Sequence, residues 1–356
     1  MKTMTVALAA SCALQLVGCS SGPVPPTKAP VLACASYTVT DLGVLGAGSY
    51  SKGGAIDDDG AVTGFSYMTA DGAVSHGYYS ACGRGMVDVG ALTAGSNSLG
   101  NAVRNHVVVG ASETANHNLH AFSWTLAGGL VDLGTLGGSG SYDQSEAYGV
   151  NASGVAVGMS LSPSGFQHAV QFSGGRVVDL DPILGGSATS SSTAVAINDS
   201  GVIVGTTDKI AYSYDGTTVT ELGAISPSSI SHGGVIAGSI ISGRTQHPAI
   251  YRNGAIIDLG LPSAFSTATA TAANDRDQVV GTGLSTGLQA GQPVAFISNR
   301  GALANLTTLV HGWQITSANG INNAGAIAAT GIPLGASSQA AHALVLAPDE
   351  KCNHAP

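Results

Sequence analysis

The sequence predicts an all-β fold, a seven-bladed β-propeller whose N-terminal and C-terminal strands pair to close the ring. Three observations lead to this prediction. A degenerate unit recurs seven times, each unit encodes four short strands, and the first and last strands each lack a hairpin partner. The clearest unit reads His120-Ala-Phe-Ser-Trp124, then Val131-Asp132-Leu133-Gly134, then Gly149-Val-Asn151-Ala-Ser-Gly154-Val-Ala-Val-Gly158.

Three short elements mark each unit. The Asp-Leu-Gly element recurs after 47, 44, 47, 42, 37 and 47 residues, at Asp41, Asp88, Asp132, Asp179, Glu221, Asp258 and Asn305. An apolar-Asn-x-x-Gly element recurs at Asp57, Asn151, Asn198, Asn274 and Asn322, with Val103 or its neighbour and Ser231 in the degenerate copies. A third element starts at His76, His120, His168, His247 and His342, with Ile210 or its neighbour and Val294 in the other copies. A four-stranded unit of about 40–50 residues is typical of a propeller blade, because β-helix rungs are much shorter.

The elements predict two hairpins in each unit. Residues 194–197 and 202–204 are apolar runs on either side of Asn198-Asp-Ser-Gly201, where the Asn can cap the turn and the Gly can adopt positive φ. Residues 121–125 and 130–133 flank Ala127-Gly128-Gly129 in the same way. Two hairpins give four strands in each blade.

The chain ends favour a closed ring over an open solenoid. The first predicted strand, residues 37–42, and the last, residues 342–346, each lack the partner that the other supplies. If they pair as Phe122 does with Leu133, Leu344 faces Leu42, and the same register sets Cys34 opposite Cys352. A disulfide there would close the ring covalently, and in the chain-entropy model it would add about 5 kcal/mol to the free energy of unfolding. Cys82 is left over in this scheme; the alternative is a bond between Cys34 and Cys82.

The first 33 residues predict export and anchoring. Residues 1–18 combine Lys2 with an apolar stretch too short to cross a bilayer, as in a signal peptide. Leu16-Val17-Gly18-Cys19 resembles the lipobox of bacterial lipoproteins, which makes Cys19 the predicted lipid attachment site; the alternative is an ordinary signal peptide. Residues 19–33 form a Pro/Ser-rich tether, residues 34–352 the propeller and residues 353–356 a tail. By resemblance to lipoprotein sorting patterns, Ser20 after the Cys indicates an outer membrane or cell surface location.

The pattern HAFSW…VDLGTLGG…GVNASGVAVG, within residues 120–158, is similar to the HAF repeat family of bacterial proteins, which are regarded as extracellular. The resemblance extends over about residues 36–347 and is weakest around residues 231–238. It implies export and a repeat-built β structure, and it implies no particular chemistry.

Composition and motifs narrow the possible activities. The net charge is −9 with only 12 Lys and Arg, and no basic stripe is present, so we expect no nucleic-acid partner. We expect no cofactor, metal or catalytic residue, because phosphate-loop, zinc and nucleophile-elbow patterns are absent. We interpret the repeated His and Asp residues as structural, with hydrogen bonds between strands or blades. We interpret Asp57-Asp58-Asp59-Gly60 as an ordinary turn rather than a calcium loop.

Candidate contact residues lie on one of the longer loops, where Tyr142, Asp143 and Glu146 combine an aromatic ring with two carboxylates. The aromatic residues considered for a contact face are Tyr50, Tyr67, Tyr78, Tyr142 and Tyr148. Two functions from different classes fit. The first is a lipid-anchored binding or structural module of the cell envelope, with a protein or glycan ligand. The second is an envelope hydrolase that acts on polysaccharide through carboxylates at the channel mouth, which acids or histidines converging in a deep pocket would favour.

Overall fold

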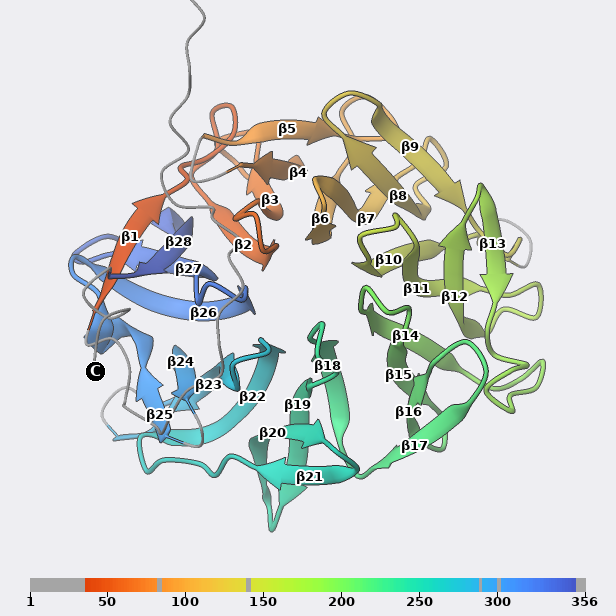
Figure 1. Ribbon diagram of the computed structural model, residues 1–356. Coiled ribbons are helices and arrows are strands. Elements are labelled where there is room, and N and C mark those ends of the chain that lie inside the picture. Colours follow the sequence, from red (N-terminus) through yellow and green to blue (C-terminus); the bar gives the residue numbers. More distant parts are fainter. Residues whose placement is uncertain (1–35, 82–84, 139–141, 288–289, 300–301, 350–356) are drawn as a thin grey trace, which may run out of the picture.

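The computed structural model describes residues 36–349 except 82–84, 139–141, 288–289 and 300–301. Seven four-stranded antiparallel sheets are arranged as blades around a central channel (Figure 1). This confirms the predicted seven-bladed β-propeller. In six blades the four strands follow the chain from the innermost to the outermost, and in the seventh the N-terminal strand is the outermost.

The blades are numbered along the chain. Blade 1 contains β2 (Ser51–Ile56), β3 (Val62–Tyr67), β4 (Ser75–Ser80) and β5 (Val87–Gly90). Blade 2 contains β6 (Ser98–Arg104), β7 (Val107–Glu113), β8 (Leu119–Thr125) and β9 (Gly129–Gly134). Blade 3 contains β10 (Ser145–Val150), β11 (Ala156–Leu161), β12 (Gln167–Ser173) and β13 (Arg176–Asp179). Blade 4 contains β14 (Ser192–Ile197), β15 (Ile203–Thr207), β16 (Ala211–Tyr214) and β17 (Val219–Gly223).

The remaining blades follow the same order. Blade 5 contains β18 (Ser226–Ile230), β19 (Ile236–Ser242), β20 (Thr245–Arg252) and β21 (Ala255–Asp258). Blade 6 contains β22 (Phe265–Ala273), β23 (Gln278–Ser285), β24 (Pro293–Asn299) and β25 (Ala302–Asn305). Blade 7 contains β26 (Trp313–Ile321), β27 (Ile327–Pro333), β28 (His342–Pro348) and, as its outermost strand, β1 (Tyr37–Asp41). Two short 3-10 helices, η2 (Leu306–Leu309) and η3 (Ser338–Ala340), lie in connections.

The two chain ends close the ring, as predicted, but in a register one residue away from the expected one. β1 pairs with β28 so that Leu344 faces Asp41 rather than Leu42. The cause is a β-bulge in the clear repeat, where Phe122 faces Asp132 and not Leu133. The register that set Cys34 directly opposite Cys352 is therefore off by one. Both cysteines, like Cys82 and Cys19, lie outside the described residues, so the disulfide stays a prediction.

The predicted hairpins are present. In the Asn198 turn, the Asn198 N–H donates to the Val202 carbonyl at 3.0 Å, and Asn198 Oδ1 accepts from the Val202 N–H at 2.9 Å. Gly201 has a φ of +82°, which explains the glycine at this position of the repeat. Asp57-Asp58-Asp59-Gly60 forms the equivalent turn, since Asp57 Oδ1 accepts from the Ala61 N–H at 2.8 Å.

The repeated His and Asp residues form a clasp at the outer part of the blades. In five blades the His Nδ1 lies 2.9–3.0 Å from the nearer carboxylate oxygen of the Asp on the adjacent outermost strand, in the pairs His76–Asp88, His120–Asp132, His168–Asp179, His247–Asp258 and His342–Asp41. The same carboxylates accept an N–H two residues further on, for example Gly134 N–H to Asp132 at 2.8 Å. A serine from the following blade completes the clasp, because Ser145 Oγ donates to the Gly134 carbonyl at 2.7 Å and accepts the Ala121 N–H at 2.9 Å. The hydrogen bonds predicted for these residues between strands are present.

Small residues set the spacing between blades. A Cβ added to Gly100 would lie 2.1 Å from Thr63 Oγ1 of the preceding blade, and one added to Gly53 would lie 2.5 Å from the Ala329 carbonyl oxygen. The buried side chains form clusters between successive blades; the largest fully buried ones include Phe122, Tyr78 and Tyr212. Close approach of the inner strands therefore explains part of the high glycine content.

Candidate functional site in the central channel

Every innermost strand carries a β-bulge at the same place. The bulge lies between Gly53 and Ala55 in β2 and between Gly100 and Ala102 in β6, and it recurs in the other five inner strands. The residues at these bulges line the channel: Gly54, Asn101, Tyr148, Val195, Ser228, Thr271 and Asn319. The bulge thus turns one residue of each blade toward the axis.

Three of these bulge residues connect neighbouring blades. Asn101 Nδ2 donates to the Ala147 carbonyl at 3.0 Å, Thr271 Oγ1 to the Ala318 carbonyl at 2.6 Å and Asn319 Nδ2 to the Gly53 carbonyl at 2.5 Å. Tyr148, Val195 and Ser228, in blades 3–5, make no such bond among the described residues. These three side chains therefore line the channel without a hydrogen bond to a neighbouring blade.

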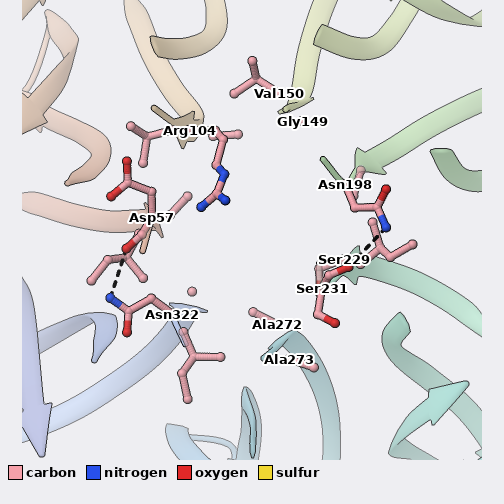
Figure 2. Close-up of a pocket in the computed structure, with 18 of the residues that line it drawn as sticks. Asp57, Arg104, Gly149, Val150, Asn198, Ser229, Ser231, Ala272, Ala273 and Asn322 are labelled. Atoms are coloured by element: carbon pink, nitrogen blue, oxygen red, sulfur yellow. Dashed lines mark hydrogen bonds between the residues drawn. The ribbon is translucent and has the colours of Figure 1, made fainter. Parts of the chain in front are cut away.

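One end of the channel is ringed by the turns that follow the seven inner strands, and we call it the turn-side mouth. It encloses a cavity of about 230 Å³. Figure 2 shows the turns around this space and the Arg104 side chain pointing into it. Amide side chains link successive turns, because Asn322 Nδ2 donates to the Asp57 carbonyl at 3.0 Å and Asn198 Nδ2 to the Ser231 carbonyl at 3.4 Å.

Four charged or titratable residues meet across this mouth, and we call Arg104, Asp58, Asp199 and His232 the charged bridge. Arg104 Nη1 donates to Asp58 Oδ2 at 3.0 Å, and Arg104 Nη2 donates to Asp199 Oδ2 at 2.5 Å. His232 Nε2 lies 3.2 Å from Asp58 Oδ2, and His232 Nδ1 lies 2.9 Å from Asp199 Oδ2. These residues come from blades 2, 1, 4 and 5. The contacts Arg104–Asp58 and Asp199–His232 join neighbouring blades, whereas Arg104–Asp199 and His232–Asp58 reach across the mouth between blades that are not adjacent.

Backbone N–H groups hold the two carboxylates in place. Asp58 Oδ1 accepts from the Asn323 N–H at 2.9 Å, and Asp199 Oδ1 accepts from the Ala152 N–H at 2.8 Å. Asp275 extends the network, since its carboxylate accepts from the Gly233 N–H at 2.6 Å. The carboxylates at the mouth are thus fixed in position by neighbouring turns.

The bridge favours the charged forms of Asp58, Asp199 and His232. The hydrogen bond with His232 is the largest influence on the pKa of Asp58, which lies well below its usual range. The same contact raises the pKa of His232 above its ordinary value of 6.5, despite partial burial. Burial raises the pKa of Asp199, but hydrogen bonds from Arg104 and the Ala152 N–H outweigh it, and the net shift is downward. Both carboxylates are therefore ionised, and their charges are compensated within the bridge.

Sequence reasoning missed this bridge, although its residues occupy repeat positions. Arg104 stands where other blades have the turn-capping Asn, and its blade replaces the usual turn by two residues with positive φ, Asn105 at 49° and His106 at 62°. Asp58 and Asp199 each follow the capping residue of their turns. The departure of the Val103 copy from the repeat was the signal that could have identified Arg104.

The other end of the channel opens toward the loops that join successive blades, and its wall forms a cavity of about 420 Å³. We call this cavity the loop-side chamber; it is lined by Asn101, Tyr148, Gln167, Thr193, Val195, Pro227 and Ser228. None of these side chains carries a charge. Glu146 stands beside the chamber, where its carboxylate accepts from Asn101 Nδ2 at 2.8 Å and from the Tyr148 hydroxyl at 3.2 Å.

The structure separates the three predicted contact residues. Glu146 lies on the inner strand β10 and its partners line the channel, whereas Asp143 lies on the preceding loop and accepts from the Gly138 N–H at 3.1 Å. Tyr142, on the same loop, is 65% exposed. A ligand role for these residues stays a prediction.

The predicted aromatic residues also have different surroundings. Tyr148 lines the channel and Tyr78 is fully buried. Tyr50 and Tyr67 pack with Phe65, at ring centroid distances of 5.1 Å between the tyrosines and 5.9 Å between Tyr50 and Phe65. These residues therefore do not form a single contact face.

Within the described part of the chain, no group of three or more His, Cys, Asp or Glu residues has a metal-binding arrangement. Among the same residues, no helix has the length and apolarity to span a bilayer.

Comparison with known proteins yields fold neighbours only. No family model and no curated protein matches the chain. Solved structures that resemble it include a puromycin-hydrolyzing peptidase from Mycobacterium tuberculosis, with 14% identity and a TM-score of 0.46 over 65% of this chain and 40% of that chain. TolB from Acinetobacter baumannii has 14% identity and a TM-score of 0.40 over 78% of this chain and 60% of that chain. An oligogalacturonate lyase from Vibrio parahaemolyticus has 11% identity and a TM-score of 0.47 over 88% and 94% of the two chains. The chain spans about 40% of the length of the first of these proteins, and none of the three comparisons bears on its activity.

Proposed function

We propose that this protein is a binding module of the cell envelope, held there by a lipid on Cys19, with its ligand in the central channel. The charged bridge is the observation that carries the choice of a binding module. Acids and a histidine do converge in the channel, as a hydrolase would require. Their hydrogen bonds, however, are made to one another and to the backbone of neighbouring turns.

The protonation states support binding over glycoside hydrolysis. A hydrolase that uses two carboxylates needs one of them protonated as a general acid, with a raised pKa. The pKa values of Asp58 and Asp199 are both lowered. Burial raises the pKa of the neighbouring Asp57, but that side chain is buried and caps its own turn. The bridge therefore braces the ring and offers no acid to a substrate.

The N-terminal sequence supports the proposed location. The lipobox-like Leu16-Val17-Gly18-Cys19 precedes a Pro-rich tether, and several acyl chains on Cys19 would give stable membrane residence where a single chain would not. Replacing Cys19 with Ser should move most of the protein from the membrane fraction to the soluble fraction. Cys82→Ser serves as the control and should remain in the membrane fraction; equal fractionation of both variants would contradict the anchor.

The function is tested with full-length protein in detergent, by measuring both binding to and cleavage of envelope polysaccharide. We expect saturable binding without release of new reducing ends. Cleavage that is lost in an Asp58→Asn or Asp199→Asn variant would contradict the proposal and establish the hydrolase.

A further inference from the structure

We propose that the loop-side chamber binds a neutral, hydroxyl-rich saccharide segment. This inference rests on the proposed binding function and adds the chemical class of the ligand and the place where it binds.

The route to the chamber follows from the charged bridge. Arg104 reaches from blade 2 to Asp199 of blade 4, and His232 reaches from blade 5 to Asp58 of blade 1, so both side chains lie across the turn-side mouth. A ligand of more than a few atoms must then approach from the side of the interblade loops. The loop-side chamber lies on that route, and it shares Tyr148 and Ser228 with the wall of the turn-side mouth.

The hydrogen-bonding groups of the chamber suit hydroxyl groups, which both donate and accept. The Ser228 hydroxyl makes no side-chain hydrogen bond among the described residues, so it is open to a ligand. Thr193 Oγ1 accepts from Gln167 Nε2, which leaves the threonine hydroxyl hydrogen to be donated. Glu146 is fixed by Asn101 and Tyr148 and has further acceptor capacity beside the chamber.

The absence of charge on the lining disfavours other ligand classes. An anionic ligand would lose its hydration without meeting a cation among the seven lining residues, and Glu146 would repel it. A polypeptide partner is normally held by buried aromatic or aliphatic anchors, whereas the apolar lining here is limited to Val195, Pro227 and the Tyr148 ring. The volume of about 420 Å³ lies within the range of about 300–1,000 Å³ that is usual for small-ligand sites.

Two inner strands provide a matched pair of variants. Thr193 in β14 and Thr269 in β22 occupy equivalent positions, each one residue before the alanine that starts the bulge and each opposite a threonine, Thr206 or Thr282. Only Thr193 belongs to the chamber lining. Thr193→Val therefore removes a chamber hydroxyl at nearly constant volume, and Thr269→Val makes the same change elsewhere in the ring.

The experiment measures binding of full-length protein by calorimetry to neutral hexasaccharides of glucose, xylose and mannose, with hexagalacturonate as the anionic comparison. At least one neutral hexasaccharide should bind more tightly than hexagalacturonate. Thr193→Val and Ser228→Ala should each weaken its binding by about tenfold, as expected for a lost hydrogen bond. Thr269→Val should leave the affinity within about twofold, and thermal melting should show that all three variants are folded.

The outcomes separate this inference from the proposed function. Preference for hexagalacturonate, or neutral-sugar binding that neither chamber variant changes, would overturn the chamber assignment while leaving a binding module. A protein ligand whose capture is lost in Ser228→Ala would overturn the saccharide class and retain the site. Cleavage of the hexasaccharides would overturn the binding-module function itself.

Discussion

The turn-side mouth and the loop-side chamber belong to one channel and share four wall residues, Asn101, Tyr148, Val195 and Ser228, yet their chemistry differs. At the mouth, charges from four blades are paired with one another across the axis. In the chamber, the lining is uncharged and includes the Ser228 hydroxyl, which has no side-chain hydrogen bond within the described part of the chain. We infer from this comparison that a departure from the repeat stabilises the ring where the substituted side chain finds protein partners, and leaves a surface for a ligand where it does not.

The largest expected effect is at the mouth. Arg104→Met keeps much of the side-chain bulk but removes the hydrogen bonds to Asp58 and Asp199, and it leaves the two carboxylates with His232 as their remaining partner within the bridge. We expect the free energy of unfolding to fall by about 2–3 kcal/mol, measured by denaturant titration, since charged hydrogen bonds in partly buried sites contribute on this order.

An exposed ion pair provides the control for this prediction. Arg252 contacts Asp277 on the surface, and its side chain is 43% exposed. Arg252→Met should cost less than about 1 kcal/mol, as is usual for surface pairs. If Arg104→Met costs no more than Arg252→Met, the charged bridge does not brace the ring.

A smaller effect should appear in the pH dependence. Because the folded-state pKa of His232 is raised above 6.5, its contribution to stability is fully present below that value and is lost as the pH rises through the folded pKa. His232→Gln should therefore destabilise the protein by about 1 kcal/mol near pH 6 and by less near pH 9. Unfolding measured at both pH values checks the sign.

The control for the histidine is His311, which is exposed in the connection before β26. His311→Gln changes an exposed side chain and should alter the free energy of unfolding by less than about 0.5 kcal/mol. A loss in His232→Gln that grows toward high pH would contradict the contacts assigned to His232.

The smallest expected effect is a stabilisation. Asp57 occupies the position of the capping Asn, is buried, and has an Oδ2 that lacks a hydrogen-bond donor among the described residues. Burial raises its pKa, so the charged form at neutral pH opposes folding. Asp57→Asn should add about 1 kcal/mol to the free energy of unfolding at pH 7, and less below pH 4.

The reverse substitution in another blade is the matched control. Asn322→Asp replaces an amide that donates to the Asp57 carbonyl, and it should destabilise by a similar amount. Stabilisation by both variants, or by neither, would mean that the repeat position does not distinguish an amide from a carboxylate.

Much of the fold could be predicted from the sequence, because the turn chemistry is local. Asn198 and Gly201 specify their hairpin within a few residues, and the repeated His and Asp lie on strands joined by a short turn. The register of β1 against β28 could not be predicted to the residue. A single bulge shifts the pairing by one residue, and the repeat pattern does not show where the bulge lies.

Less of the site could be predicted, because its contacts join residues far apart in the chain. Arg104 and Asp199 are 95 residues apart and meet only because the ring brings their turns to one axis. Asp143 and Glu146 are close in sequence, yet Asp143 accepts a hydrogen bond from its own loop and Glu146 accepts one from the neighbouring blade. Contacts across the mouth depend on how closely the turns approach one another around the ring, which a linear pattern does not encode.

The most direct test compares Arg104→Met with Thr193→Val by measuring both unfolding free energy and neutral-saccharide affinity on the same samples. We predict that Arg104→Met loses about 2–3 kcal/mol of stability while its affinity stays within about twofold. Thr193→Val should lose no more than about 1 kcal/mol of stability, from its hydrogen bond with Gln167, while losing about tenfold in affinity. If either variant changes both quantities to this extent, or if the two effects are exchanged, the division of the channel into a brace and a binding chamber is wrong.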